Sequence, residues 1–355
     1  MSHLLQHLLG IRLPIIQAPM AGSQGSALAL AVCAAGGLGS LPAATLSPAQ
    51  LQQELQVLRD QAQGPWNVNF FCHAPPAASP AVDQAWCAAL APLYADAGLP
   101  PPQGPSVAAR APFSAEVADL VAPFRPPVVS FHFGLPSPEL LARVKGWGAK
   151  VLSSATTVAE ARWLQARGVD AIIVQGLEAG GHRGLFLDAD LSTQLPTAAL
   201  LPQVRRAVSV PVIAAGGVVD AAGVTAMQAL GADGVQVGTA YLLCPEALTA
   251  PLHRQALLSP AAAHTALTNV FTGRPARGIV NRAMRALGQQ GVGISPLAPA
   301  FPLAASAWQA LREHAESQGS SDYTPLWAGM NAPLCQPLPA AELTAALAAG
   351  WRAQG

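Results

Sequence analysis

Charged residues are scarce in this sequence. Only 11% of its 355 residues are Asp, Glu, Lys or Arg, and nineteen basic residues balance nineteen acidic ones. No run of Lys or Arg occurs, so the basic surface expected of a protein that binds nucleic acid or an anionic membrane is missing. With 51% hydrophobic residues the chain is far from the composition of disordered proteins and can build a large core. The expected partner is therefore a small molecule.

Several common sequence signals are also missing. The five cysteines are scattered and never in C-x-x-C spacing, which disfavours a disulfide framework and a zinc site. The glycine motifs of dinucleotide and P-loop nucleotide sites are absent. Residues 13–53 carry no charge, but prolines and glycines divide them into pieces too short for a membrane span. Since the N-terminus has no basic secretory signal, we expect a cytoplasmic protein.

Eight short apolar runs end in glycine, proline or small polar residues, and most are followed by a helix-like segment. They are residues 13–20, 36–42, 66–71, 127–133, 149–156, 170–176, 210–217 and 233–239. Alternation of strands and helices is typical of βαβ units in a parallel sheet. Eight such units predict an α/β fold of the (β/α)8 TIM-barrel type. A doubly wound open sheet is the alternative, although it leaves the glycine-rich ends of the last two runs less well explained.

The chain is longer than a barrel needs. We expect a ligand-binding barrel over 1–245 with an insertion at about 73–125, then a substrate-covering helical segment over 246–335 and a C-terminal tail or helix over 336–355. Both additions follow the carboxyl ends of strands, where barrel enzymes place their active sites. The inserted segments are therefore predicted to form a lid or a small second domain over that face.

The last two strands are followed by glycine-rich loops. These read AAGGVVD (214–220) and VGTAYLL (237–243), and barrels bind phosphate at these two places through backbone N–H groups. The alternative is that the glycines only make tight turns. Asn69, Gln175 and Gln236 stand at strand ends, where their amides could hydrogen-bond either an isoalloxazine ring or nearby backbone.

One histidine stands among four glycines in VQGLEAGGHRGLF (174–186). The pKa of free histidine suits proton transfer at neutral pH, and a loop this rich in glycine can approach a flat cofactor closely. His182 is therefore the candidate acid or base, with a structural or solvated histidine as the alternative. His132 is a second candidate that could instead be a core residue bonded to backbone. Arg183 could attract an anionic substrate or be solvated.

Six motifs occur in the order found in a known family. QAPMAG (17–22), VSFHFGLP (129–136), VQGLEAGGHRG (174–184), PVIAAGG (211–217), VQVGTAYLL (235–243) and DYTPLWAGMNA (322–332) resemble nitronate monooxygenases of the first class, formerly called 2-nitropropane dioxygenases. The resemblance implies FMN, no metal, and oxidation of alkyl nitronates such as propionate 3-nitronate by O2 through a flavin semiquinone. The E-A-G-G-H-x-G motif also resembles enoyl reductases, so an NAD(P)H-dependent quinone or enoyl reductase on the same barrel is the alternative.

The family's functional positions can be placed on this sequence. The resemblance implies that His182 is the active-site histidine and that His132 lies at the substrate. The implied FMN contacts are Met20, Asn69, Gln175, Gly180, Gly217, Gln236, Val237, Gly238 and Thr239. The implied partners are a nitronate and O2, with no nucleic acid or membrane. The sequence leaves the oligomeric state open, a homodimer included.

Overall fold

Eight parallel strands form the barrel that the apolar runs predict. In this computed structural model, which describes residues 4–77, 79–103 and 110–351, they are ordered β1-β9-β8-β6-β5-β4-β3-β2 around the sheet. A parallel bridge between Ile16 and Leu38 joins the two ends of that order. The strands are β1 (Ile15–Gln17), β2 (Gly39–Pro42), β3 (Trp66–Phe71), β4 (Val128–His132), β5 (Lys150–Ala155), β6 (Ala171–Gln175), β8 (Val212–Ala215) and β9 (Gly234–Val237). Each lies within one predicted run, so the TIM-barrel fold is confirmed.

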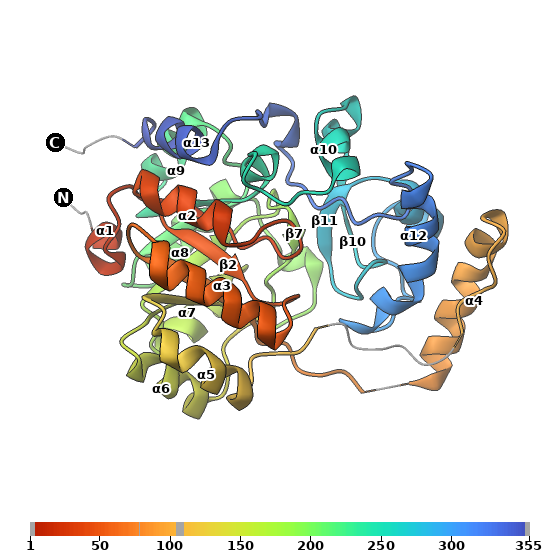
Figure 1. Ribbon diagram of the computed structural model, residues 1–355, viewed down its shortest axis with the longest axis horizontal. Helices are drawn as coiled ribbons and strands as arrows, with labels where there is room; N and C mark the ends of the chain where they lie inside the picture. Colours follow the sequence, from red (N-terminus) through yellow and green to blue (C-terminus); the bar gives the residue numbers. More distant parts are fainter. Residues whose placement is uncertain (1–3, 78, 104–109, 352–355) are drawn as a thin grey trace.

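Helices surround the barrel (Figure 1). They are α2 (Ser26–Ala35), α3 (Pro48–Gln61), α5 (Ala115–Val121), α6 (Pro138–Gly146), α7 (Val158–Ala166), α8 (Thr197–Ala207), α9 (Ala221–Ala229) and α13 (Ala340–Ala348). The start of α3 shows why these segments are helical: Ser47 accepts a hydrogen bond from the Gln50 N–H, and the Gln50 side chain accepts one from the Ser47 N–H. The eighth helix, α13, lies far along the chain from β9 but packs between α9 and α2.

One short apolar helix fills one end of the barrel interior. Helix α1 (Leu4–Leu9) places Leu5 and Leu9 against side chains that point inward from the strands, among them Ile16, Leu152 and Ile213. All five side chains are almost fully buried. This end of the barrel is therefore packed with side chains, as the fold requires, and only the opposite end can hold a ligand.

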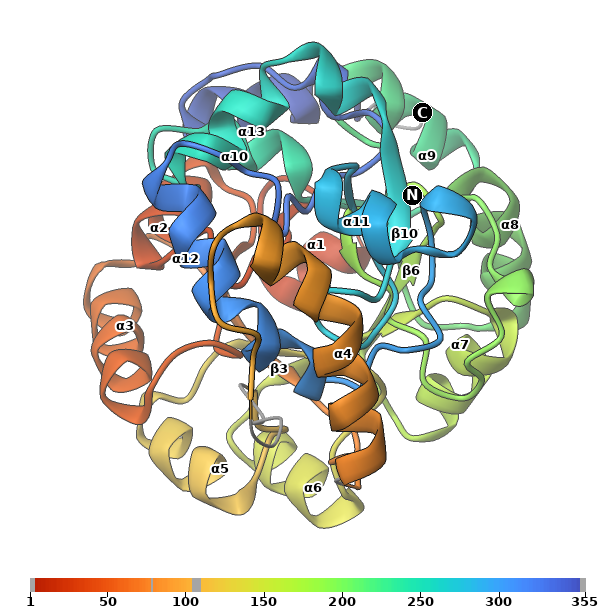
Figure 2. The same ribbon diagram turned by 90° about the vertical axis from the view of Figure 1, so that its right-hand side faces the viewer.

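A second, smaller core lies beside the barrel. It joins α4 (Pro80–Asp96), from the insertion after β3, to α11 (Arg282–Leu287), α12 (Gln309–Ser317) and the strand β10 (Thr265–Thr268). The neighbouring helix α10 (Pro251–Leu257) and strand β11 (Ala276–Ile279) instead place their buried apolar residues in the barrel core. Trp86 and Leu90 of α4 pack with Trp308, Leu311 and Tyr323, and the Trp86 indole donates to the Ala304 carbonyl. Figure 2 shows α4, α11 and α12 in front of the barrel, inside the ring of its helices.

Short 3-10 helices connect these elements. They are η1 (Ala122–Phe124), η2 (Leu191–Thr193), η3 (Thr239–Leu243), η4 (Pro260–Ala263), η5 (Gln289–Gly291), η6 (Leu303–Trp308) and η7 (Ala332–Leu334). No helix in the described ranges is both long enough and apolar enough to cross a membrane.

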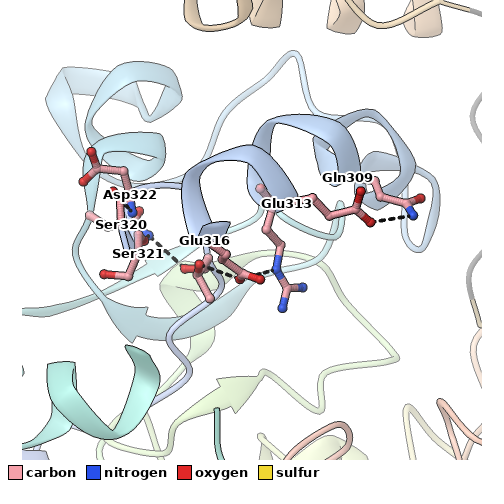
Figure 3. A network of polar contacts seen from close by, with 9 residues as sticks. Gln309, Glu313, Glu316, Ser320, Ser321 and Asp322 are labelled. Carbon is pink, nitrogen blue, oxygen red and sulfur yellow. Dashed lines mark hydrogen bonds and ion pairs between the residues drawn. The ribbon is translucent and has the colours of Figure 1, made fainter. Parts of the chain in front are cut away.

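Polar side chains fix the C-terminal end of α12 to the turn that follows it. Glu316 accepts from the Arg312 Nε at 2.7 Å and from the Thr324 hydroxyl at 2.8 Å, and Ser320 Oγ accepts from the Asp322 N–H at 3.2 Å. Figure 3 shows this network along one side of the helix, where Gln309 also donates to Glu313. Arg312 is thus paired with the carboxylate of Glu316, and its side chain is half exposed at the edge of the second core.

A three-stranded antiparallel sheet that the sequence did not predict links the two cores. Its strands are ordered β10-β11-β7, where β7 (Gly181–His182) is part of the glycine-rich loop after β6. His182 pairs with Ala276 and Gly181 with Arg277. The histidine loop is therefore held on one side by the barrel and on the other by the C-terminal segment.

Candidate active site

A cavity of about 190 Å³ opens at the carboxyl ends of the barrel strands. Among the residues that line it are most of those predicted from the sequence: Met20, Asn69, His132, Gln175, Gly180, His182, Gly217, Gln236, Gly238 and Thr239. Val237 is the exception, because its side chain is buried in the core between the sheet and the helices. The convergence of these strand ends on one cavity is what the barrel fold predicts.

One end of the cavity is lined by backbone from the loops after β8 and β9. Gly216 and Gly217 both have left-handed backbone, with φ of +115° and +76°, which glycine adopts without strain. The N–H groups of Gly217 and Val218 have no acceptor within the described part of the chain. The Gly217 carbonyl accepts from the Asn331 side chain at 2.6 Å, which fixes the turn. Unpaired N–H groups at a glycine turn suit a phosphate oxygen.

The amide side chains that line the cavity differ in which of their atoms remain available to hydrogen-bond a ligand. The Asn69 Nδ2 donates to the carbonyl and the hydroxyl of Ser130, so its Oδ1 is left as an acceptor. The Gln236 side chain lines the cavity without a hydrogen bond to any described residue. Gln175 is different, since its Nε2 donates to the His182 carbonyl at 2.9 Å and its Oε1 accepts from the Gly184 N–H at 2.7 Å. Gln175 therefore holds the histidine loop as well as lining the cavity.

Gly180 lines the cavity and also makes a tight packing contact. A Cβ added there would lie 2.6 Å from the carbonyl carbon of Ala328 and from the nitrogen of Gly329. The loop and the segment 328–329 thus pass each other backbone to backbone, which only glycine allows at this distance. One reason for the glycines around His182 is this packing against the C-terminal segment.

His182 lies in an aromatic enclosure. Its ring centre is 5.3 to 6.2 Å from the ring centres of Phe301, Trp327, Phe133 and Phe71. Its Nε2 lies 2.9 Å from the Thr272 hydroxyl oxygen. Burial, followed by the positive charge of Arg110, holds the pKa of His182 well below its ordinary value. The imidazole is therefore neutral at pH 7 and able to accept a proton.

His132 also lines the cavity, but both of its ring nitrogens are engaged. Nδ1 lies 2.9 Å from the Ser154 hydroxyl oxygen and Nε2 lies 3.2 Å from the His182 carbonyl oxygen. Burial lowers the pKa of His132 to about 3, so this ring is neutral as well. The geometry favours a residue that positions the His182 loop, and a direct contact with substrate stays a prediction.

Arg183 points away from the cavity into the protein. Its side chain is fully buried and donates to the carbonyls of Gly176 (2.6 Å) and Gln175 (2.9 Å) and to the Gln194 Oε1. Neither interpretation from the sequence is right, because the guanidinium is neither solvated nor available to a substrate. It joins the end of β6 to the loop that carries His182.

Several residues around His182 were not found from the sequence. Thr272, Phe301, Trp327 and His253 come from the C-terminal segment, and Arg110 comes from the insertion after β3. The sequence positions of these residues show no periodicity, and none lies at a strand end, so strand and helix patterns give no signal for them. Two signals were available: Trp327 lies in the DYTPLWAGMNA motif (322–332), and both segments follow carboxyl ends of strands.

His253 gives a prediction for stability against pH. Its side chain is 6% exposed, its Nε2 has no partner in the described ranges, and burial lowers its pKa from 6.5 to about 4. As the pH falls below 6.5, the unfolded chain binds a proton that the folded chain does not, so stability decreases toward pH 4. Between pH 7 and pH 5 this histidine should lower the free energy of unfolding by about 2 kcal/mol, because the full slope of about 1.4 kcal/mol per pH unit applies only below pH 6.5.

Urea unfolding at pH 7 and pH 5 tests this. From pH 7 to pH 5 the free energy of unfolding should fall by about 2 kcal/mol more in the wild type than in His253→Gln, which has no titrating group at this position. Comparing the two proteins cancels the carboxylates that both share. Equal losses in both would show that the His253 pKa is not lowered.

Comparison with known proteins identifies the family. The family model described as nitronate monooxygenase matches residues 2–350. The chain belongs to the nitronate monooxygenase family. It is similar to proteins named nitronate monooxygenase from Paraburkholderia phytofirmans (44% identical over 343 residues, 96% of this chain and 92% of that one) and Pseudomonas aeruginosa (42% over 349 residues, 97% of each).

A solved structure agrees with this. The structure described as nitroalkane oxidase from Streptomyces ansochromogenes superposes with a TM-score of 0.87 at 38% identity, over 98% of this chain and 97% of that one. This member of the nitronate monooxygenase family is therefore an oxidoreductase. The described residues contain no cluster of three or more His, Cys, Asp or Glu side chains that could hold a metal ion.

Proposed function

We propose that this chain is an FMN-dependent nitronate monooxygenase that oxidises short alkyl nitronates, propionate 3-nitronate among them, with O2 in the cytoplasm. The observation that carries the proposal is the neutral imidazole of His182, enclosed by aromatic rings and flanked by cationic side chains in one cavity with the glycine turn at 216–217. An anion fits beside such a histidine, because the surrounding charge is positive and water is largely excluded.

The residues present fit FMN. The free N–H groups of Gly217 and Val218 suit its phosphate, and the Asn69 Oδ1 and the Gln236 amide suit a ring that carries both donors and acceptors. Met20 lines the same cavity, with its Sδ 3.8 Å from where a Gly238 Cβ would stand. When bound, FMN supplies the acceptor that takes electrons from the substrate and passes them to O2.

The protein's own residues hold the substrate and control its protonation. Because Nε2 of His182 contacts the Thr272 hydroxyl, Nδ1 is the nitrogen left for the substrate. For a nitronate, which is already an anion, the ring needs only to donate a hydrogen bond. For a neutral nitroalkane, Nδ1 has to accept the proton from the carbon that bears the nitro group. Phe71, Phe133, Phe301 and Trp327 surround the imidazole ring, with their ring centres 5.3 to 6.2 Å from its own.

Oxygen uptake tests the proposal. The purified protein with FMN should consume O2 on addition of ethyl nitronate without NADH or NADPH. Heat-denatured protein and free FMN are the controls. A protein that consumes O2 or reduces a quinone only when NADH or NADPH is present would contradict the proposal and favour the reductase alternative.

A further inference from the structure

Arg110 is a partly buried arginine that has no acidic partner among the described residues. It comes from the insertion after β3 and lines the cavity that contains His182. Its guanidinium carbon lies 6.0 Å from the centre of the Phe301 ring, and that ring is 5.3 Å from the ring of His182. The guanidinium and the imidazole therefore contact the same aromatic ring.

The other arginines near the site have an acidic side chain nearby. Burial lowers the pKa of Arg183, Arg274 and Arg277, and a glutamate charge partly offsets this in each: Glu178 and Glu160 at Arg183, Glu160 at Arg274, and Glu178 at Arg277. For Arg110 the only charge with a marked effect is that of another arginine, Arg312. Among the described residues no carboxylate forms an ion pair with it.

A buried cation without a counter-ion is costly, since desolvation is not offset by attraction. In a cavity the missing counter-ion can be supplied by the ligand. One anionic group of the ligand, the nitronate, already belongs at His182 if the proposed function holds. A guanidinium that lines the same cavity fits a second anionic group, because its two parallel N–H donors match the two oxygens of a carboxylate.

We propose that Arg110 is a specificity-determining residue, which selects nitronates with a carboxylate at the end of the chain away from the nitro group by binding that carboxylate. This inference rests on the proposed function. It assigns to one residue of the insertion the choice between propionate 3-nitronate and propyl 1-nitronate, which has a methyl group in place of the carboxylate.

Kinetics with these two substrates test the assignment. Arg110→Met keeps the length of the side chain and removes the charge. It should lower kcat/KM for propionate 3-nitronate by about 30-fold or more, mostly through KM, because truncating one partner of a buried charge pair costs at least about 2 kcal/mol. For propyl 1-nitronate the loss should be at least about tenfold smaller, because this substrate loses only the nearby positive charge and no direct contact with a carboxylate, and the activity that remains also shows that the variant is folded. Arg110→Lys keeps the charge but not the paired N–H donors of the guanidinium. Its kcat/KM for propionate 3-nitronate should lie between those of the wild type and Arg110→Met.

Arg312→Met is the matched control. It removes a second positive charge near Arg110, but Arg312 is half exposed, already paired with Glu316 and outside the cavity lining. It should change kcat/KM for either substrate by less than about threefold. Equal losses on both nitronates in Arg110→Met, or a loss as large in Arg312→Met, would overturn the assignment.

Equilibrium binding separates this inference from the proposed function. Succinate matches propionate 3-nitronate in length and charge, and butyrate matches propyl 1-nitronate. Calorimetry on the FMN-loaded protein should show that Arg110→Met weakens succinate binding about 30-fold or more and weakens butyrate binding at least about tenfold less. If neither nitronate is oxidised by the wild type, the proposed function fails, yet selective loss of succinate binding still supports the anion site. Succinate binding that is unchanged in Arg110→Met overturns it.

Discussion

His182→Asn should lower the oxidation of a neutral nitroalkane by about 100-fold or more, while much of the nitronate oxidation remains. General-base catalysis typically contributes 10²-fold to 10⁴-fold, and only the neutral substrate needs a base. The asparagine amide can still donate a hydrogen bond to a nitronate. Steady-state rates with nitroethane and with ethyl nitronate at one pH give the two values.

The lowered pKa of His182 also predicts how the oxidation of nitroethane depends on pH. A base whose pKa lies below 6.5 is deprotonated throughout the range from pH 6.5 to 8. The wild-type kcat/KM for nitroethane should therefore stay level over that range and not fall toward its acid side. Equal losses of both activities in His182→Asn would contradict the role as base and leave only anion binding.

Arg183→Met should destabilise the protein by about 3 to 5 kcal/mol. The side chain is fully buried, and its removal leaves the carbonyls of Gly176 and Gln175 and the Gln194 oxygen without their donor. Unsatisfied buried acceptors each cost about 1 to 3 kcal/mol, and breaking a buried charged network reaches the range given. Urea unfolding at pH 7 measures the change.

The same substitution at an exposed arginine is the matched control for Arg183→Met. Arg206 is exposed on α8, so Arg206→Met should change the unfolding free energy by less than about 0.5 kcal/mol. If Arg183→Met were as stable as the wild type but bound nitronates weakly, the arginine would be a substrate residue, and the structural role described above would be wrong.

The barrel and the strand-end residues were predictable from the sequence because they follow local rules. Each strand is a short apolar run with a glycine, proline or small polar end, and parallel strands bring those ends together. Asn69, Gln236 and the turn at 216–217 could therefore be placed in one cavity before the structure was known. For these residues the position at a strand end is enough to predict that they line the cavity, whereas Val237, which follows Gln236, points to the opposite face of the strand.

Contacts between distant segments could not be predicted in this way. The Thr272 hydroxyl reaches His182 because β11 pairs with the two-residue strand β7, and a strand that short has no period to detect. Trp86 meets Trp308 through a core that joins the insertion to the C-terminal segment. Arg183 was expected either to attract an anionic substrate or to be solvated, because an arginine among glycines gives no sign that its hydrogen-bond partners lie inside the protein.

An anaerobic titration of the FMN-loaded protein tests the central claim most directly. Propionate 3-nitronate added alone should bleach the flavin absorbance, and admitting O2 should restore it. NADH or NADPH added to a second anaerobic sample should leave the flavin oxidised over the same time. Rapid bleaching by a nicotinamide cofactor, with none by the nitronate, would contradict nitronate oxidation as the function of this site.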